Sequence, residues 1–341
     1  MKAGTFAIAL AALASAAVGA ALVASGGEAT GGGQAAAFTV GRAPASAKTK
    51  APSPTTQQAA SVPSRDAPAA AAVPPVTPES LGAPEVDAEV NPTAPEAAAA
   101  PSFRQTNTYA GGVVYVPVAC SGAYDVILHF HGAHNYVREL VEKAQIQAVV
   151  VVFNSGNGAE RYSQAFQGGG MLNALLRQIE LATAPLCPGG EAKPKRVALS
   201  AWSAGYAAVE KLLARSEDRS RVDAVLLADG LHAPLMDRWK RTFAPKALEA
   251  FVELGTSAIA GGKLFAITHS AIETPGYGST TECSKLLLEK LSLPSQGNFV
   301  SANVSGFSIE GSGGADKAAH IAQFRQMDAG LLSKLRKRWG G

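Results

Sequence analysis

Several side chains able to do chemistry stand directly after predicted strands or in the loops that follow them: His131, Ser203, Asp229, His269 and His320. A serine hydroxyl is a weak nucleophile until a base removes its proton, and histidine does this best near neutral pH. A carboxylate behind the histidine fixes the tautomer that can accept the proton. Because Ser203, Asp229 and His320 supply these three groups, the sequence predicts a site for nucleophilic catalysis by a serine.

The serine lies in a short turn between a predicted strand and a predicted helix. The apolar run 197–199 indicates a buried strand, and apolar residues at helical spacing over 206–213 indicate a helix. Ala201 and Gly205 stand two positions before and after Ser203. Small residues are needed there, because larger ones would collide with the adjoining strand and helix. The pattern predicts a tight turn that exposes the serine hydroxyl above the sheet.

This strand–turn–helix unit resembles the nucleophile elbow of the α/β-hydrolases, with Ala201 where the first glycine of Gly-x-Ser-x-Gly is usual. A second similarity is the apolar strand 124–130, which runs into His131-Gly132-Ala133. In this family the turn after that strand and the residue after the serine donate backbone N–H groups to an oxyanion. The resemblance therefore implies an oxyanion hole built from Ala204 together with Ala133 or Gly132.

The same resemblance implies the chain order of nucleophile, acid and base. His320 follows the last predicted strand and begins the last predicted helix, which is where the family places its base. Two carboxylates could orient it. Asp229 ends the strand next after the elbow, whereas Glu273 follows the strand after that, which is the more common position in the family. We favour Asp229 and keep Glu273 as the alternative acid.

Three histidines also raise the possibility of a zinc site. His129, His131 and His134 lie within six residues, and strand alternation places the first two on one face. The carboxylates that usually support zinc-bound histidines are not evident nearby, and a His-x-His-Gly turn is also what the resemblance implies. We therefore predict no metal. Four aromatic side chains are expected to line or buttress a pocket, with core packing as the alternative for the tryptophan: His131, Trp202, His232 and His269.

The predicted elements alternate along residues 103–341. Strands are expected at 113–118, 124–130, 148–153, 197–199, 222–228, 263–268 and 299–304. Helices are expected at 136–144, 172–181, 206–213, 245–254, 281–291 and 319–338, with a long loop over 154–170. Alternation of this kind predicts a doubly wound, mostly parallel α/β sheet flanked by helices, with the site beyond the carboxyl ends of the strands.

The first part of the chain has a different composition. Residues 1–25 hold Lys2 and then a charge-free apolar run over 3–24, which indicates a signal peptide or an N-terminal membrane anchor. Residues 26–102 are rich in alanine and proline and are predicted to form a disordered linker. This arrangement predicts an exported protein that is periplasmic, membrane-anchored or secreted, with possible membrane attachment through residues 3–24.

Charge and cysteine content limit the classes of partner and the covalent bonds that we expect. Of the 30 Lys+Arg and 27 Asp+Glu, 5 and 7 lie in residues 1–102, which leaves a formal charge of +5 on the rest. No basic run is dense enough to indicate a nucleic-acid partner. The three cysteines lack metal or redox-pair spacing. Because Cys120 and Cys187 both stand in loop-like sequence, they are the favoured disulfide, with Cys283 left over.

The resemblance covers about residues 113–338 and implies a serine hydrolase that cleaves carboxylic esters through an acyl-enzyme intermediate, without a cofactor. Only some 30 residues separate the strand at Asp229 from the next, so we expect an open site that accepts small-molecule or polymer-borne esters. Two alternatives stay open. One is a peptidase or amidase with the same triad, and the other is a non-catalytic α/β-hydrolase-like binding protein of the cell envelope.

Overall fold

A computed structural model describes residues 102–108, 110–188, 192–297 and 299–340 of the chain. The predicted signal or anchor and all but the last residue of the predicted linker lie outside these ranges. Within them, no helix has both the length and the apolar character that crossing a bilayer requires.

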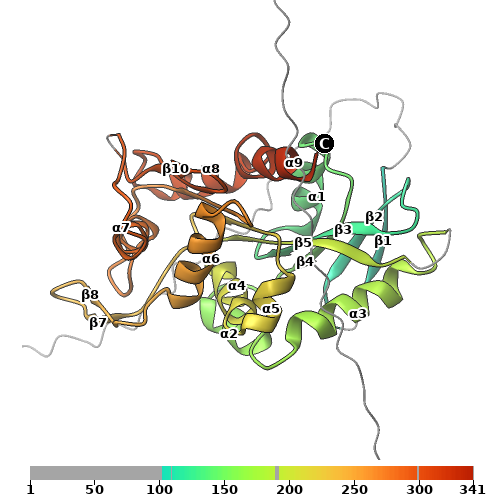
Figure 1. Ribbon diagram of the computed structural model, residues 1–341, viewed down its shortest axis with the longest axis horizontal. Helices are drawn as coiled ribbons and strands as arrows, with labels where there is room; N and C mark the ends of the chain where they lie inside the picture. The colour runs from blue at the N-terminus through green and yellow to red at the C-terminus, as the bar shows by residue number, and fades with distance from the viewer. Residues whose placement is uncertain (1–101, 109, 189–191, 298, 341) are drawn as a thin grey trace, which may run out of the picture. The chain divides into compact units, whose positions relative to one another are not determined.

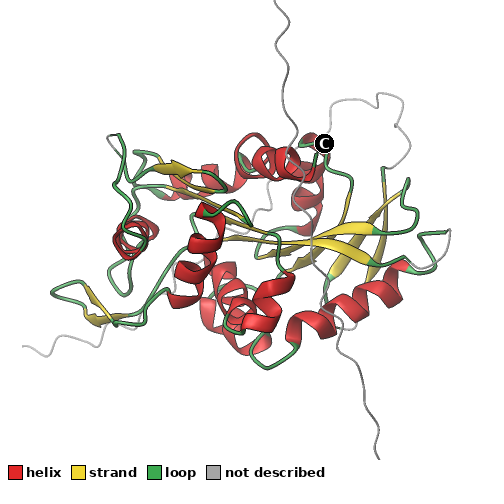
Figure 2. Ribbon diagram, in the orientation of Figure 1, coloured by secondary structure: helices red, strands yellow, loops and turns green. Residues whose placement is uncertain are grey.

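A mixed sheet forms the centre of the molecule (Figures 1 and 2). Within the described residues it has nine strands in the order β1-β2-β4-β3-β5-β6-β9-β11-β10. The six strands from β4 to β11 in this order run parallel to their neighbours, whereas β1, β2 and β10 pair antiparallel. This arrangement confirms the predicted doubly wound, mostly parallel sheet. The strands are β1 (Phe103–Asn107), β2 (Val113–Pro117), β3 (Tyr124–Phe130), β4 (Ala148–Phe153), β5 (Pro194–Trp202), β6 (Ala224–Ala228), β9 (Leu264–His269), β10 (Ala302–Val304) and β11 (Phe307–Gly311).

Helices cover both faces of this sheet (Figure 1). One face packs against α1 (His134–Lys143), α8 (Lys317–Arg325) and α9 (Ser333–Trp339). The other packs against α2 (Ala159–Ala165), α3 (Met171–Thr183), α4 (Tyr206–Leu213), α6 (Glu249–Ile259) and α7 (Thr280–Lys290). The short helix α5 (Ser216–Arg221) contacts α3 and α4. Successive strand residues point to opposite faces, so Val197 and Leu199 join one core and Ala198 joins the other.

The structure differs from the sequence prediction at both sheet edges. The sequence predicts no strand before 113–118, but the polar strand β1 lies outside it and pairs Phe103 with Pro117. The predicted last strand, 299–304, is in fact a hairpin of β10 and β11, turning at Ser305 and Gly306. The predicted final helix is interrupted by a π-helical turn, Asp328–Leu332, between α8 and α9.

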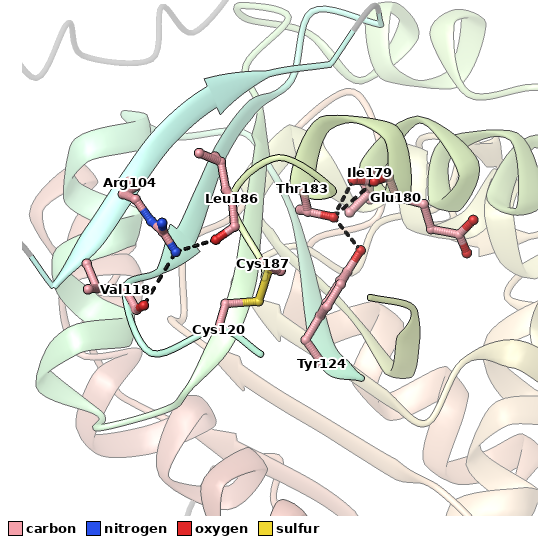
Figure 3. Close-up of a disulfide and its surroundings, with 9 residues drawn as sticks. All are labelled: Arg104, Val118, Cys120, Tyr124, Ile179, Glu180, Thr183, Leu186 and Cys187. Atoms are coloured by element: carbon pink, nitrogen blue, oxygen red, sulfur yellow. Dashed lines mark hydrogen bonds between the residues drawn. A yellow bond between two sulfur atoms is a disulfide. The ribbon is translucent and has the colours of Figure 1, made fainter. Parts of the chain in front are cut away.

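A disulfide joins Cys120 to Cys187, as predicted, and Figure 3 shows its surroundings. The first cysteine precedes β3 and the second precedes β5, so the bond lies at the amino-terminal ends of these parallel strands. Arg104 of β1 donates hydrogen bonds to the carbonyl oxygens of Val118 and Leu186, on either side of the bond. The disulfide therefore stabilises the amino-terminal ends of the parallel strands, opposite to the carboxyl ends where the candidate residues lie.

A second, two-stranded sheet interrupts the segment between β6 and α6. It consists of β7 (Leu235–Asp237) and β8 (Thr242–Phe243), which pair antiparallel. This hairpin extends away from the central sheet, at the lower left of Figure 1.

Candidate active site

Ser203 begins a 3₁₀ turn, Ser203–Gly205, between β5 and α4. Two glycines make its position possible. A Cβ on Gly205 would lie 2.0 Å from the carbonyl oxygen of Phe130, so only glycine lets α4 start this close to β3. A Cβ on Gly230 would lie 2.9 Å from the carbonyl oxygen of Ser203. The packing thus holds the backbone of Ser203 from two sides, and its side chain stays partly exposed.

Strained backbone occurs at the carboxyl ends of three adjacent parallel strands. His131 after β3, Ser203 after β5 and Asp229 after β6 have φ values of 72°, 48° and 41°. Such conformations are unfavourable for residues other than glycine and tend to occur at functional sites. Because parallel strands lie about 4.8 Å apart, the sheet brings these three residues together along one edge.

The imidazole of His320, in the first turns of α8, reaches the carboxylate of Asp229. Nδ1–H of His320 donates to Oδ2 of Asp229 at 2.8 Å. The side chain of Asp229 is fully buried, whereas that of His320 is 18% exposed. Burial raises the pKa of Asp229, but hydrogen bonding and the charge of His320, with a hydrogen bond from Ser270, outweigh burial and bring this pKa below its usual value. Asp229 is therefore ionised at neutral pH and holds His320 in the tautomer with a free Nε2.

Glu273 is the alternative acid. Among the described residues, it forms no hydrogen bond or ion pair with the imidazole of His320. It is exposed in the loop after β9, and its charge acts on Arg241. Of the two candidate acids, the structure thus brings Asp229 to His320.

Ser203 Oγ and His320 Nε2 have no hydrogen-bond partner within the described part of the chain, and no hydrogen bond joins them. In unliganded enzymes such bonds are often long and tighten when substrate binds. The residue before the serine, Trp202, links the two. Its indole N–H donates to the carbonyl oxygen of His320 at 3.2 Å, and the two rings are 5.1 Å apart. The strand that carries the serine therefore also positions the helix that carries the histidine.

Trp202 is 2% exposed and forms the centre of an aromatic stack. Its ring lies 5.0 Å from that of His131 and 4.9 Å from that of Phe324, both nearly parallel to it. These contacts agree with core packing beneath the elbow, which was one of the two interpretations of this tryptophan from the sequence.

The turn 131–133 is fixed from below by His129. Because a carbonyl can only accept, Nε2–H of His129 donates to the carbonyl oxygen of His131 at 3.0 Å, and its Nδ1 accepts from the hydroxyl of Ser200 at 2.9 Å. Burial lowers the pKa of His129 to about 3, so this ring is neutral. His131 is also neutral, since burial and the charge of His320 lower its pKa to about 4. The turn is thereby held in place without a charged group beneath it.

The predicted oxyanion donors belong to two turns, one between β3 and α1 and the other the 3₁₀ turn that begins at the serine. Among the described residues, the N–H of Ala133 makes no hydrogen bond, and Ala133 is exposed. Ala204 is the second residue of the 3₁₀ turn, where N–H groups lack an intrahelical acceptor. Gly132 has a φ of 138°, and a Cβ there would lie 2.7 Å from the ring of Phe324. The assignment of these donors stays a prediction.

The three histidines considered for zinc have separate partners. His129 binds Ser200 and the backbone, the Nδ1 of His131 is 3.0 Å from the Tyr162 hydroxyl, and the Nδ1 of His134 is 2.6 Å from the Tyr115 hydroxyl. Within the described ranges no group of three or more His, Cys, Asp or Glu side chains is arranged to hold a metal ion.

The other two predicted pocket histidines, His232 and His269, have different surroundings. His232 packs 5.1 Å from the rings of both Tyr206 and Tyr277, and its Nδ1–H donates to the carbonyl oxygen of Gly278. Burial lowers its pKa, although the charge of Asp229 opposes this. His269 instead lines a separate cavity of about 280 Å³, to which none of Ser203, Asp229 and His320 contributes.

Ser270 is a functional candidate that the sequence argument missed. Its hydroxyl donates a hydrogen bond to Oδ2 of Asp229, the same oxygen that accepts from His320. The other oxygen, Oδ1, is buried without a partner among the described residues. A signal was present in the sequence, because Ser270 directly follows β9, the strand after which the α/β-hydrolases commonly place their acid.

No protein-family profile and no curated protein matches the chain. Similar solved structures include an esterase from Pyrobaculum calidifontis, at 13% identity over 68% of this chain and 85% of that one, with a TM-score of 0.37. Esterase Pf2001 from Pyrococcus furiosus is 14% identical over 70% and 93% of the two chains, with a TM-score of 0.39. A cold-adapted esterase from an Arctic intertidal metagenomic library is 14% identical over 69% and 92%, with a TM-score of 0.37.

The architecture of the chain itself shows its fold. The parallel strands are flanked by helices on both faces, and β5 passes through a strained turn at Ser203 into α4. Along the chain, Ser203 comes first, then Asp229 and then His320, which is the order of nucleophile, acid and base in this fold. The chain has the α/β-hydrolase fold.

Proposed function

We propose that this protein is a serine hydrolase that cleaves carboxylic esters. The observation that carries the proposal is the buried Asp229–His320 pair beside a partly exposed serine in a strained turn. Asp229 keeps the proton of His320 on Nδ1, so Nε2 can accept a proton from the hydroxyl of Ser203. No other group of the described residues combines a nucleophile, a base and an acid in this way.

The reaction has two halves. Ser203 Oγ attacks the carbonyl carbon of the ester while Nε2 of His320 takes its proton, and the N–H groups of Ala133 and Ala204 bind the resulting oxyanion. Collapse of this intermediate breaks the ester C–O bond, and His320 returns the proton to the departing alcohol. Water then attacks the acyl-enzyme with its proton going to His320, and Ser203 leaves with that proton as the carboxylic acid is released.

The surroundings of the serine favour an open site. The segment between β6 and β9 consists mainly of the β7–β8 hairpin and α6, and α6 packs on the core. The loop over 154–170, which could cover the site, contains α2, whose Tyr162 is buried beside His131. Small-molecule and polymer-borne esters are the substrates proposed for such a site. The apolar run over residues 3–24 and the Cys120–Cys187 disulfide support action outside the cytoplasm.

Labelling with a fluorophosphonate tests the proposal. We expect the purified full-length protein to be labelled on Ser203, with no labelling of Ser203→Ala, much slower labelling of His320→Ala, and unchanged labelling of the control Ser220→Ala, an exposed serine on α5. Turnover of nitrophenyl esters but not of the matching anilides would distinguish an esterase from an amidase.

A folded wild-type protein that is not labelled would overturn the catalytic proposal. That result would favour the alternative of a non-catalytic binding protein. The observation that supports this alternative is that no hydrogen bond joins Ser203 to His320 within the described residues.

A further inference from the structure

The tip of the β7–β8 hairpin, residues 236–240, holds the most exposed large apolar side chains in the described part of the chain. Trp239 is 97% exposed and Met236 is 68% exposed. A tryptophan with almost no protein contact gives up a large favourable burial energy. Apolar side chains grouped in this way usually mark a surface that contacts something else.

The tip is held rigidly at its own turn. The side chain of Asp237 accepts hydrogen bonds from the backbone N–H groups of Trp239 and Lys240, at 2.9 and 3.0 Å. The exposed position of the indole is therefore set by the backbone and does not depend on contacts of the ring itself.

Arg241, the last residue of the turn between β7 and β8, is equally well fixed. The guanidinium of Arg241 binds both carboxylate oxygens of Glu282 and donates to the carbonyl oxygens of Thr274 and Tyr277, at 3.0 and 3.1 Å. Because the tip is already ordered, it loses little conformational entropy when it binds a partner. Even a small contact area can then give useful affinity.

Arg241 also connects the hairpin to the candidate active site. Arg241 binds the carbonyl oxygen of Tyr277, and the ring of Tyr277 packs against His232, whose pKa responds to the charge of Asp229. The hairpin follows β6 in the chain and projects from the central sheet, as Figure 1 shows. Its tip is thus a rigid extension of the region beside the acid.

The exposed indole has cationic residues as its neighbours in the sequence. Arg238 and Lys240 flank Trp239 in the chain, both are exposed, and within the described residues neither forms an ion pair. The carboxylate of Asp237 is already engaged by backbone N–H groups. A tryptophan with an apolar neighbour and adjacent cations has the composition of segments that bind the interface of a bilayer with anionic lipids.

We propose that the hairpin tip docks on a bilayer with anionic headgroups, with Trp239 and Met236 entering the interface and Arg238 and Lys240 contacting the headgroups. A second copy of the chain fits less well, because two side chains fall far short of the roughly 800 Å² per partner in a stable interface and paired tips would bring like charges together. The consequence for substrate choice rests on the proposed function: Ser203 would then hydrolyse esters presented at that surface.

Fluorescence of Trp239 in the full-length protein tests this docking. Trp202 is buried and Trp339 is partly buried, so the difference between the wild type and Trp239→Phe isolates the signal of the tip. With vesicles of phosphatidylglycerol and phosphatidylcholine we expect a blue shift of this signal, and quenching when the acyl chains are brominated. Vesicles of phosphatidylcholine alone should give a much weaker response.

Matched variants separate the tip from the rest of the surface. Neutralising both cations in Arg238→Gln/Lys240→Gln should lower vesicle partitioning roughly 30-fold, since each cation near an anionic surface contributes about fivefold. Arg177→Gln and Leu181→Ser, exposed positions on α3 far from the hairpin in Figure 1, should leave partitioning unchanged.

Three results would overturn the proposal. One is cosedimentation with vesicles while the Trp239 signal stays that of water, which would place the contact in another segment such as residues 3–24. Another is a blue shift that grows with protein concentration without lipid, which would indicate self-association. The third is a response to a soluble anionic polysaccharide and none to vesicles. Hydrolysis of a soluble nitrophenyl ester is measured in parallel, so a failure of the proposed function is seen separately.

Discussion

Replacing Asp229 by asparagine tests the candidate triad most directly. The carboxylate is fully buried, and its Oδ2 accepts from both His320 and Ser270. An asparagine can keep its oxygen at this position, which retains both donors but removes the negative charge. If its nitrogen takes that position instead, Nδ1 of His320 must give up its proton, and the ring then presents N–H to the serine. Either orientation impairs His320 as a base.

The expected effect is large. Loss of the charge or of the correct tautomer in a Ser-His-Asp triad lowers kcat by about 10³- to 10⁴-fold, or about 4–5.5 kcal/mol of transition-state stabilisation. An amide nitrogen at the Oδ1 position would also be buried, where the described residues provide no partner for it. Burying this unpaired amide should lower the free energy of unfolding by about 1–3 kcal/mol, in addition to the effect on kcat.

The assay is kcat for a soluble nitrophenyl ester, with fluorophosphonate labelling as a second measure and thermal unfolding as a check on folding. Glu273→Gln is the matched control, because Glu273 is the alternative acid and is exposed. We expect that control to retain wild-type kcat within about twofold, as is usual for exposed substitutions. The reasoning is refuted if a folded Asp229→Asn protein keeps kcat within tenfold of the wild type, or if Glu273→Gln loses as much.

Three further predictions concern other parts of the chain. Ser270→Ala removes a hydrogen bond that lowers the pKa of Asp229, so that pKa should rise and kcat should fall about tenfold; an unchanged titration of this carboxylate, followed by carbon NMR, would contradict this. Replacing Cys120 and Cys187 by alanine opens a loop with a sequence separation of 67 and should lower the free energy of unfolding by about 4 kcal/mol, measured by denaturant titration against the wild type. Burial raises the pKa of the Cys283 thiol to about 12, so the thiolate is scarce at neutral pH and iodoacetamide should label this residue only after unfolding; fast labelling of the native protein would argue against that burial.

Elements with strong apolar patterns could be predicted from the sequence. The strands 124–130 and 148–153 have the predicted bounds, and α4 covers the predicted 206–213, because burial on one or both faces leaves a clear apolar periodicity. The polar strand β1 has no such signal, since it lies at the sheet edge and all of its side chains remain partly or fully exposed. The strand β11 was not predicted as a separate strand, because the turn before it consists of only Ser305 and Gly306.

The candidate site could be predicted only in part, for a related reason. Positions after parallel strands share one edge of the sheet, so the sequence could bring Ser203, Asp229 and His320 to the same region. The contact between Asp229 and His320 spans 91 residues of chain and depends on where α8 packs, which no local pattern encodes. The hydrogen bond from Ser270 to Asp229 likewise depends on the pairing of β6 with β9.

The close packing around the elbow defines a sequence signature for proteins of this kind. Position 201 carries an alanine whose methyl group is buried in the core, so a side chain is tolerated there. No side chain fits at 205, and one at 230 would press on the backbone of Ser203. A pattern that requires any small residue, Ser and Gly at the elbow, followed one strand later by Asp-Gly, would retrieve such chains, whereas a search for glycine on both sides of the serine would pass over them.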